Sequence, residues 1–147
     1  MSNQGIELRT GSNISLSSLL GLYEAVGWSS YTRDERQGDL EKAIENSNFV
    51  VSAWEGSTLV GLARALSDDV SIFYLQDILV HPDHQRCGIG EQLLRACMTR
   101  YAHVRSKALM TDDEDRQRLF YEKAGFRNTK DLSSGNLNTF VQIDGVD

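Results

Sequence analysis

The sequence predicts a mixed α/β (α+β) fold in one domain, and three observations predict it. Runs rich in β-branched and aromatic residues, typical of strands, alternate with segments whose apolar residues recur at helical spacing. The 147 residues are 40% hydrophobic and 24% charged, as in an ordinary globular domain. No internal repeat and no Ser/Gly-rich linker divides the chain. We therefore expect residues 1–147 to form a single domain.

The N-terminal part of the chain predicts a strand followed by two helices. Residues 6–9 form a strand candidate. Apolar residues at i, i+3, i+4 and i+7 from Leu16 to Tyr23 predict an amphipathic helix. Thr32 and Glu35 have the spacing of a capping box, which predicts that a second helix begins there.

The rest of the chain alternates strands with helices. Residues 49–66 contain two strand runs joined by a short turn, the pattern of a hairpin. The long apolar run at residues 70–80 breaks its alternation, which indicates a bulge or a strand buried on both faces. A helix is expected after this run, and a strand at residues 104–111 follows it. An acidic helix start at residues 112–115 and a last strand at residues 137–143 complete the pattern.

Charge and cysteine content exclude several classes of protein. Twenty-one acidic against fifteen basic residues give a net charge of −6, which argues against nucleic acid and anionic membranes as partners. No run approaches the ~18 apolar residues of a membrane span, and no secretory signal pattern opens the chain. Cys87 and Cys97 provide neither a disulfide framework nor a zinc spacing. We therefore expect a cytoplasmic protein that needs no metal.

Gly88 and Gly90 mark the turn from the long strand into the following helix. Without Cβ atoms the backbone can approach a ligand closely, and the helix N-terminus adds a partial positive charge. Together with Arg86, these features predict an anion site suited to a diphosphate. Neither the lysine of a Walker loop nor a Rossmann GxGxxG motif is present. A glycine-rich turn that binds nothing is the alternative.

A second signal is the run Phe-Tyr-Glu-Lys-Ala-Gly-Phe at residues 120–126. Phe120 and Phe126 are expected to anchor in the core, with Gly125 at the end of the helix. Because adjacent helical residues point about 100° apart, Tyr121 is expected at the edge of that core. A phenol with a pKa of about 10 carries its proton at pH 7 and can act as a general acid. A packing role for this tyrosine is the alternative.

Three matched segments together resemble one enzyme family. Gln85-x-x-Gly88-x-Gly90 matches the [Q/R]-x-x-G-x-[G/A] pyrophosphate motif of the GNAT superfamily of acetyl-CoA-dependent N-acetyltransferases. Val80-x-Pro82 before this motif and the run at residues 120–126 after it are also typical of the superfamily. The resemblance spans residues 49–126. It implies a mixed, splayed sheet flanked by helices, with acetyl-CoA as cosubstrate in a V-shaped gap beside the long strand.

The resemblance also implies roles for individual residues. Backbone groups of Ile78, Leu79 and Val80 would pair with pantetheine. An N–H group there, expected to be that of Ile78, would stabilise the oxyanion. Tyr121 aligns with the tyrosine that commonly protonates the departing CoA. The cofactor loop is expected to consist of Gln85, Arg86, Cys87, Gly88, Ile89, Gly90 and Glu91.

The general base is where this sequence departs from the family. The carboxylate that the family often uses falls at Tyr74, which we group with the substrate-binding residues. Asp77 is the nearest carboxylate and the candidate base. The face of the strand on which its side chain lies depends on the bulge. A water chain or no dedicated base is one alternative. A partly buried Asp77 satisfied by backbone N–H groups is another.

Trp28 and Tyr31 lie between the first two helices, where the family usually builds one wall of the acceptor pocket. Aromatic faces can hold an aryl group or a cation, although both rings can equally be core anchors. We expect acetyl transfer to a primary amine of a small molecule by direct attack in a ternary complex. A protein or peptide N-acetyltransferase and a non-catalytic acyl-CoA-binding domain are the alternatives. A homodimer remains open as the assembly.

Overall fold

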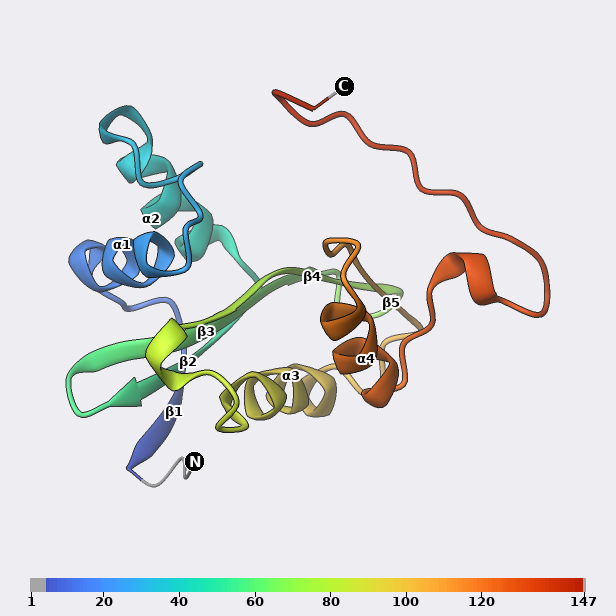
Figure 1. The fold of residues 1–147 in the computed structure, drawn as a ribbon, viewed down its shortest axis with the longest axis horizontal. Coiled ribbons are helices and arrows are strands. Elements are labelled where there is room, and N and C mark those ends of the chain that lie inside the picture. The colour runs from blue at the N-terminus through green and yellow to red at the C-terminus, as the bar shows by residue number, and fades with distance from the viewer. Residues whose placement is uncertain (1–4, 147) are drawn as a thin grey trace. The chain divides into compact units, whose positions relative to one another are not determined.

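A five-stranded sheet forms the core of the first part of the chain (Figure 1). The computed structural model describes residues 5–146, which fall into two units, one ending at Met110 and one beginning at Thr111. The sheet order is β1-β2-β3-β4-β5; the first four strands are antiparallel neighbours and β5 is parallel to β4. The mixed sheet predicted from the sequence is therefore confirmed. The strands are β1 (Ile6–Thr10), β2 (Phe49–Glu55), β3 (Thr58–Ser67), β4 (Ile72–Val80) and β5 (Ser106–Leu109).

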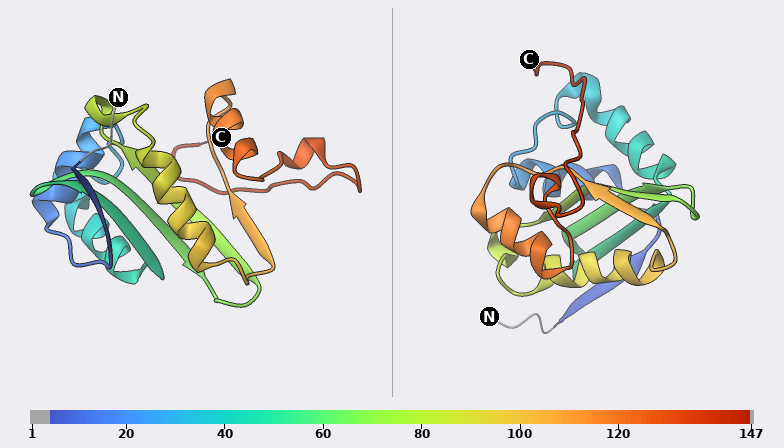
Figure 2. Two further views of the ribbon diagram at one scale, coloured as in Figure 1. Left: turned by 90° about the horizontal axis from the view of Figure 1, so that it is seen from below. Right: turned by 90° about the vertical axis from the view of Figure 1, so that its right-hand side faces the viewer.

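Helices cover both faces of this sheet (Figure 2). On one face, Leu62 of β3 belongs to a buried cluster with residues of the first two helices. On the other face, a Cβ atom on Gly61 would lie only 3.1 Å from Ile89 and 3.2 Å from Leu93 of the third helix, so glycine permits their close approach. Within residues 5–146, no helix is long and apolar enough to cross a membrane. The three helices of this unit are α1 (Leu16–Ala25), α2 (Gln37–Asn46) and α3 (Ile89–Arg100).

A β-bulge interrupts β4 and changes the face to which its side chains point. Arg64 of β3 pairs with Asp77, but the next residue of β3 pairs with Leu75, so Gln76 is the extra residue. Before the bulge, the ring of Phe73 lies 5.0 Å from that of Tyr101 at the end of α3. After the bulge, β4 contributes to the buried cluster under α1 and α2. The broken alternation of the sequence therefore reflects a bulge, one of the two predicted explanations.

The predicted capping box at the start of α2 is wrong. The hydroxyl of Thr32 donates to the Ser29 carbonyl at 3.4 Å and is used within its own turn. A 3₁₀ turn at Asp34–Arg36 follows, and α2 begins only at Gln37, without a side-chain cap on its first N–H groups. Local side-chain bonds of this kind compete with helix capping, and the spacing of Thr32 and Glu35 does not reveal which of the two prevails.

The predicted strand at residues 137–143 is also wrong. These residues adopt neither helix nor strand, and Phe140 is 91% exposed. Alternating apolar residues form a strand only where the backbone pairs with a sheet edge, and this segment joins none of the ladders described for the chain. The helix of the second unit, α4 (Asp115–Lys123), does form after the acidic segment. It ends before Gly125, whose φ of +97° suits a helix C-terminus.

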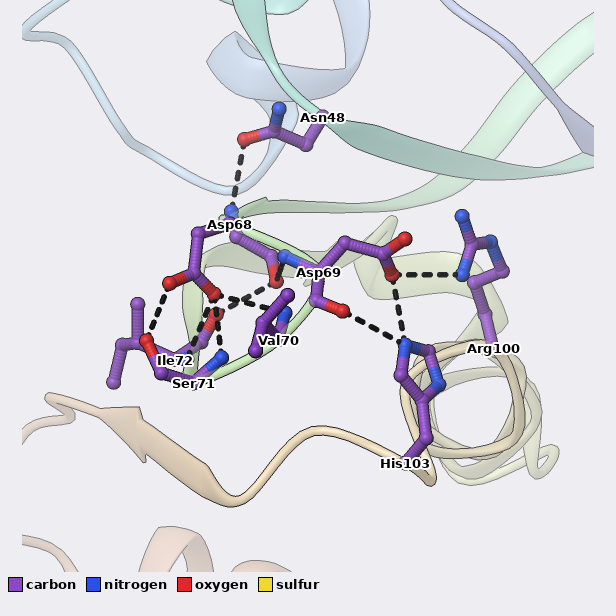
Figure 3. Close-up of polar contacts among 9 residues, drawn as sticks. Asn48, Asp68, Asp69, Val70, Ser71, Ile72, Arg100 and His103 are labelled. Carbon is purple, nitrogen blue, oxygen red and sulfur yellow. Dashed lines mark hydrogen bonds and ion pairs between the residues drawn. The ribbon is translucent and has the colours of Figure 1, made fainter.

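Two aspartates hold the turn between β3 and β4 (Figure 3). Asp68 Oδ1 accepts hydrogen bonds from the backbone N–H groups of residues 70–72 at distances of 3.0, 2.7 and 3.0 Å. Asp69 Oδ1 accepts a bond from Arg100 at 3.3 Å and lies 2.9 Å from His103 Nε2. The first aspartate thus shapes the turn, and the second ties it to the end of α3.

Asp68→Asn should remove part of the acid sensitivity of folding. The Ser71 hydroxyl and the backbone N–H groups around it hold the pKa of Asp68 well below its ordinary value of 3.8. A depressed pKa contributes stability that is present above about pH 4 and lost as the pH falls through the folded value. Asparagine keeps an Oδ1 acceptor without the charge, so its Tm should fall less between about pH 5 and 2. Parallel curves of Tm against pH for the two proteins would contradict this.

Candidate functional site

A turn joins the end of β4 at Val80 to the start of α3 at Ile89. Gly88, the residue before α3, has a φ of +82°, and Arg86 has a φ of +65°. The left-handed region explains the glycine at position 88, because a side chain is strained there. Gly88 offers no side-chain cap to the first N–H groups of α3, where the positive end of the helix dipole lies. This geometry suits an anion.

Gln85 fixes the shape of the turn from within the protein. Its Nε2 donates to the Val80 carbonyl at 3.1 Å, and the thiol of Cys87 lies 3.6 Å from the Gln85 carbonyl oxygen. The backbone N–H of His81 donates to the Val60 carbonyl at 2.8 Å, which anchors the end of β4 to β3. The side chain of Gln85 therefore makes its hydrogen bond within the protein. The backbone of residues 86–91 is then the part of the turn that can contact a ligand.

On the side away from β3, no strand of the described residues 5–146 pairs with the second half of β4, and we call this side its open edge. β5 pairs only with residues 72–75 of β4, so the two parallel strands separate after Leu75. Backbone groups alternate in direction along a strand, and His81 N–H points to β3. Ile78 and Val80 therefore direct their N–H groups to the open edge, whereas Leu79 directs its backbone to β3. Of the three residues predicted to pair with a ligand, Ile78 and Val80 have the required orientation.

Asp77 belongs to a buried network of side chains. Its Oδ2 accepts hydrogen bonds from the Tyr23 hydroxyl at 2.9 Å and from Arg64 Nε at 2.6 Å. Asp77 is 6% exposed and Arg64 is 5% exposed, so this is a buried ion pair. Burial and the neighbouring carboxylate raise the pKa of Tyr23 far above its usual range, which keeps this phenol a donor. Side chains, rather than the backbone N–H groups considered from the sequence, therefore satisfy the carboxylate.

Sequence reasoning missed Arg64 and Tyr23. Tyr23 was assigned only to the apolar face of its helix. A signal for Arg64 exists, because it is the one charged residue within the apolar run at residues 59–66. A buried arginine requires a partner, and the register of β3 and β4 places Asp77 opposite it.

The aromatic residues of the α1–α2 connection lie next to this network. The ring of Tyr23 makes edge-to-face contacts with Trp28 and Tyr31, with centroids 6.0 and 6.1 Å apart. Arg64 Nη2 donates to the Tyr31 hydroxyl at 3.4 Å. Trp28 is 39% exposed, so its ring is only partly committed to packing. The structure therefore brings both predicted wall residues to the Asp77 network.

Tyr74 lies on β4 before the bulge and is partly buried. Burial raises its pKa, and the charge of Asp77 raises it further, which places this phenol within electrostatic range of the carboxylate. The position where the family often carries a carboxylate thus holds a neutral phenol beside Asp77. Among the residues that the structure describes, no group of three or more His, Cys, Asp or Glu is arranged to hold a metal ion.

Tyr121 is the buried aromatic residue of α4, in the second unit. It is 7% exposed, whereas Phe120 and Phe126 are only half-buried, the reverse of the predicted arrangement. Its ring contacts both phenylalanine rings edge to face. Amphipathic spacing does not specify which of two adjacent aromatic residues faces inward, and the larger buried area here falls to Tyr121. Burial raises the pKa of Tyr121 to about 12, so this phenol keeps its proton throughout the physiological range.

Known proteins resemble this chain over most of its length. Residues 23–143 match the family model of the acetyltransferase (GNAT) domain. The curated protein named "Uncharacterized N-acetyltransferase ycf52", from Pyropia yezoensis, is 28% identical over 134 residues, which cover 88% of this chain and 75% of that protein. Among solved structures, the GNAT family acetyltransferase SP0256 from Streptococcus pneumoniae TIGR4 superposes with a TM-score of 0.78 at 29% identity, covering 96% of this chain and 99% of that one. AAC(6')-Iy in complex with the bisubstrate analog CoA-S-monomethyl-acetylneamine shares the fold, with a TM-score of 0.67 at 18% identity, covering 94% and 98%.

Proposed function

Because this chain belongs to the GNAT family of acetyltransferases, we propose that it transfers the acetyl group of acetyl-CoA to a primary amine of a small molecule. It is an acyltransferase that uses acetyl-CoA, which sets aside the non-catalytic alternative. The open edge of β4 beside the uncapped start of α3 is the observation that carries the proposal. Residues 1–147 act as one catalytic domain, and the unpaired Cys87 and Cys97 favour a cytoplasmic location.

The cofactor lies along the open edge and ends on the turn. The N–H groups of Ile78 and Val80 pair with the amides of pantetheine, as an added strand would. The backbone N–H groups of residues 86–91 and the helix dipole of α3 hold the pyrophosphate. A structural neighbour of this chain is in complex with a bisubstrate analog built on CoA, which supports CoA as the cofactor that this fold holds.

The reaction is a direct attack within the ternary complex. The neutral amine nitrogen forms a bond to the thioester carbonyl carbon, and the Ile78 N–H stabilises the oxyanion that develops. The C–S bond then breaks, and the thiolate takes its proton from Tyr121, which is replenished from solvent. The amide nitrogen releases its extra proton to water. Holding both reactants in one site supplies much of the rate.

The acceptor amine binds between Asp77 and the aromatic wall formed by Trp28 and Tyr31. Asp77 Oδ2 already accepts two hydrogen bonds, so proton uptake at this oxygen would break the contact with Arg64 Nε. Asp77 therefore acts by accepting an N–H bond from the amine through Oδ1, while water takes the proton. Trp28, Tyr31 and Tyr74 surround the rest of the acceptor, and the net charge of −6 attracts a cation.

A panel of amines tests this function by the release of free CoA thiol from acetyl-CoA. Small aryl amines and polyamines should turn over, with kcat/KM rising with pH until the amine is largely neutral. A cationic acceptor should also bind less tightly at high salt, because exposed charges are screened. Turnover of a peptide N-terminus with no turnover of any small amine would replace this proposal with the protein-acetylating alternative.

Trp28→Ala should raise the KM of the best amine about fivefold, because a cation–π contact at an exposed site is worth about 1 kcal/mol. The KM of acetyl-CoA should not change, since Trp28 lies in the α1–α2 connection and not on the β4–α3 turn. Steady-state kinetics with each substrate varied in turn measures both values. Trp28→Phe is the control, since it keeps an aromatic face and should retain most of the affinity. Unchanged KM values in the alanine variant would make Trp28 a packing residue only.

A further inference from the structure

One guanidinium connects three separate elements around the acceptor side of the first unit. Arg64 Nε donates to Asp77 of β4, Nη2 donates to Tyr31 of the α1–α2 connection, and Nη1 donates to Ser47 at the end of α2. The distances are 2.6, 3.4 and 3.3 Å. A buried arginine whose coplanar N–H groups donate hydrogen bonds to three elements fixes the mutual orientation of these elements.

We propose that Arg64 is a positioning residue of the acceptor site. It holds Asp77 and Tyr31 in the orientation in which they meet the incoming amine. The inference deepens the proposed function and rests on it. Arg64 is 5% exposed and its guanidinium donates to Asp77, Tyr31 and Ser47, so we assign it a role through these partners.

The position of Arg64 gives this role a mechanical basis. Asp77 immediately precedes Ile78, whose N–H points to the open edge of β4. The bulge at Gln76 leaves the local backbone less constrained by ladder bonds than a regular strand would be. The bond from Arg64 Nε to Asp77 compensates for that loss. The bond to Tyr31 extends the same constraint to the aromatic wall.

Arg64→Lys tests the proposal, because lysine keeps the charge but cannot bond to three partners in one plane. The amine KM should rise on the order of tenfold, because Asp77 and Tyr31 would no longer be held in the orientation in which they meet the amine. The KM of acetyl-CoA should stay at the wild-type value. Tyr31→Phe, which removes only the hydroxyl, should give the same split with a smaller increase. Arg100→Lys is the matched control: it makes the same exchange at an arginine that bonds to Asp69 in the β3–β4 turn, outside this network, and both KM values should remain unchanged.

The outcomes separate this inference from the proposed function. A purely structural Arg64 would lower Tm and the active fraction in Arg64→Lys without changing the KM of either substrate, and that result overturns the inference. If Arg64→Lys does not fold, Tyr31→Phe carries the test, and an unchanged amine KM in this variant overturns the inference equally. A wild-type enzyme that binds acetyl-CoA but acetylates no small amine overturns the proposed function itself.

Discussion

Tyr121→Phe is expected to lower turnover about 10²-fold while leaving the affinity for acetyl-CoA unchanged. The variant keeps the ring that packs against Phe120 and Phe126, so the fold should be retained. It removes only the hydroxyl that we propose as the proton source for the departing thiolate. Single-turnover rates and acetyl-CoA binding, measured on the same preparations, separate chemistry from binding.

The pKa of Tyr121 places this effect at the lower end of the range for general acids. Burial raises it to about 12, whereas a free thiol such as that of cysteine has a pKa of about 8.5. Burial thus makes this phenol a weaker acid toward the thiolate, which reduces the rate gain expected from proton transfer. The protonated form of this phenol is the active one, since only that form can supply a proton to the departing thiolate. Because that form persists to about pH 12, wild-type turnover should show no alkaline decline up to about pH 10.

Tyr101→Phe is the matched control for this experiment. Tyr101, at the end of α3, is also a buried tyrosine, 2% exposed. Its ring packs against that of Phe73 on β4. The same loss of a hydroxyl there should leave turnover at the wild-type level. Equal activity of Tyr121→Phe and Tyr101→Phe would assign Tyr121 to packing alone.

Gly88→Asn is expected to abolish the stabilisation of the protein by acetyl-CoA. At about 100 times its dissociation constant, a ligand stabilises the native state by about 2.7 kcal/mol, which thermal unfolding detects readily. Asparagine tolerates the left-handed backbone that Gly88 adopts at φ +82°, so the apo fold should persist. Its side chain would add bulk at the turn where we propose that the pyrophosphate binds.

Gly56→Asn provides the control for that substitution. Gly56 has a φ of +61° in the turn between β2 and β3, and a Cβ atom meets no neighbour within 4 Å at either glycine. The two variants thus share backbone strain and differ in location. Retained stabilisation in Gly88→Asn, or its loss in Gly56→Asn, would contradict the assignment of the turn. The absence of any shift for the wild type at millimolar acetyl-CoA would overturn the assignment of the cofactor.

The sequence predicted well those features that depend on local pattern. The hairpin, the turn at Gly88 and the bulge after Leu75 all leave marks within a few residues, namely turn residues, paired glycines and a break in alternation. The fold as a whole followed from three matched segments. Each of these features is fixed mainly by backbone geometry that particular residue types favour.

The features that the sequence did not reveal depend on partners far along the chain. Arg64 and Asp77 are 13 residues apart and Tyr23 and Asp77 are 54 apart, so no short window contains their network. The strand expected at residues 137–143 needed a sheet edge that no local pattern can supply. The choice between Phe120 and Tyr121 as the buried ring likewise depended on tertiary packing rather than on helical spacing.

The open edge of β4 also limits what kind of molecule can dock there. An unpaired strand edge is normally a template on which another protein chain can add a strand, and with it a route to aggregation. Here the Gln85 side chain donates a hydrogen bond to the Val80 carbonyl, and β5 pairs with the edge as far as Leu75. What remains is residues 76–80, no longer than one short strand, with a few backbone groups that a small ligand with one or two amides can reach. We therefore expect this edge to suit the proposed cofactor better than an added strand of a neighbouring polypeptide.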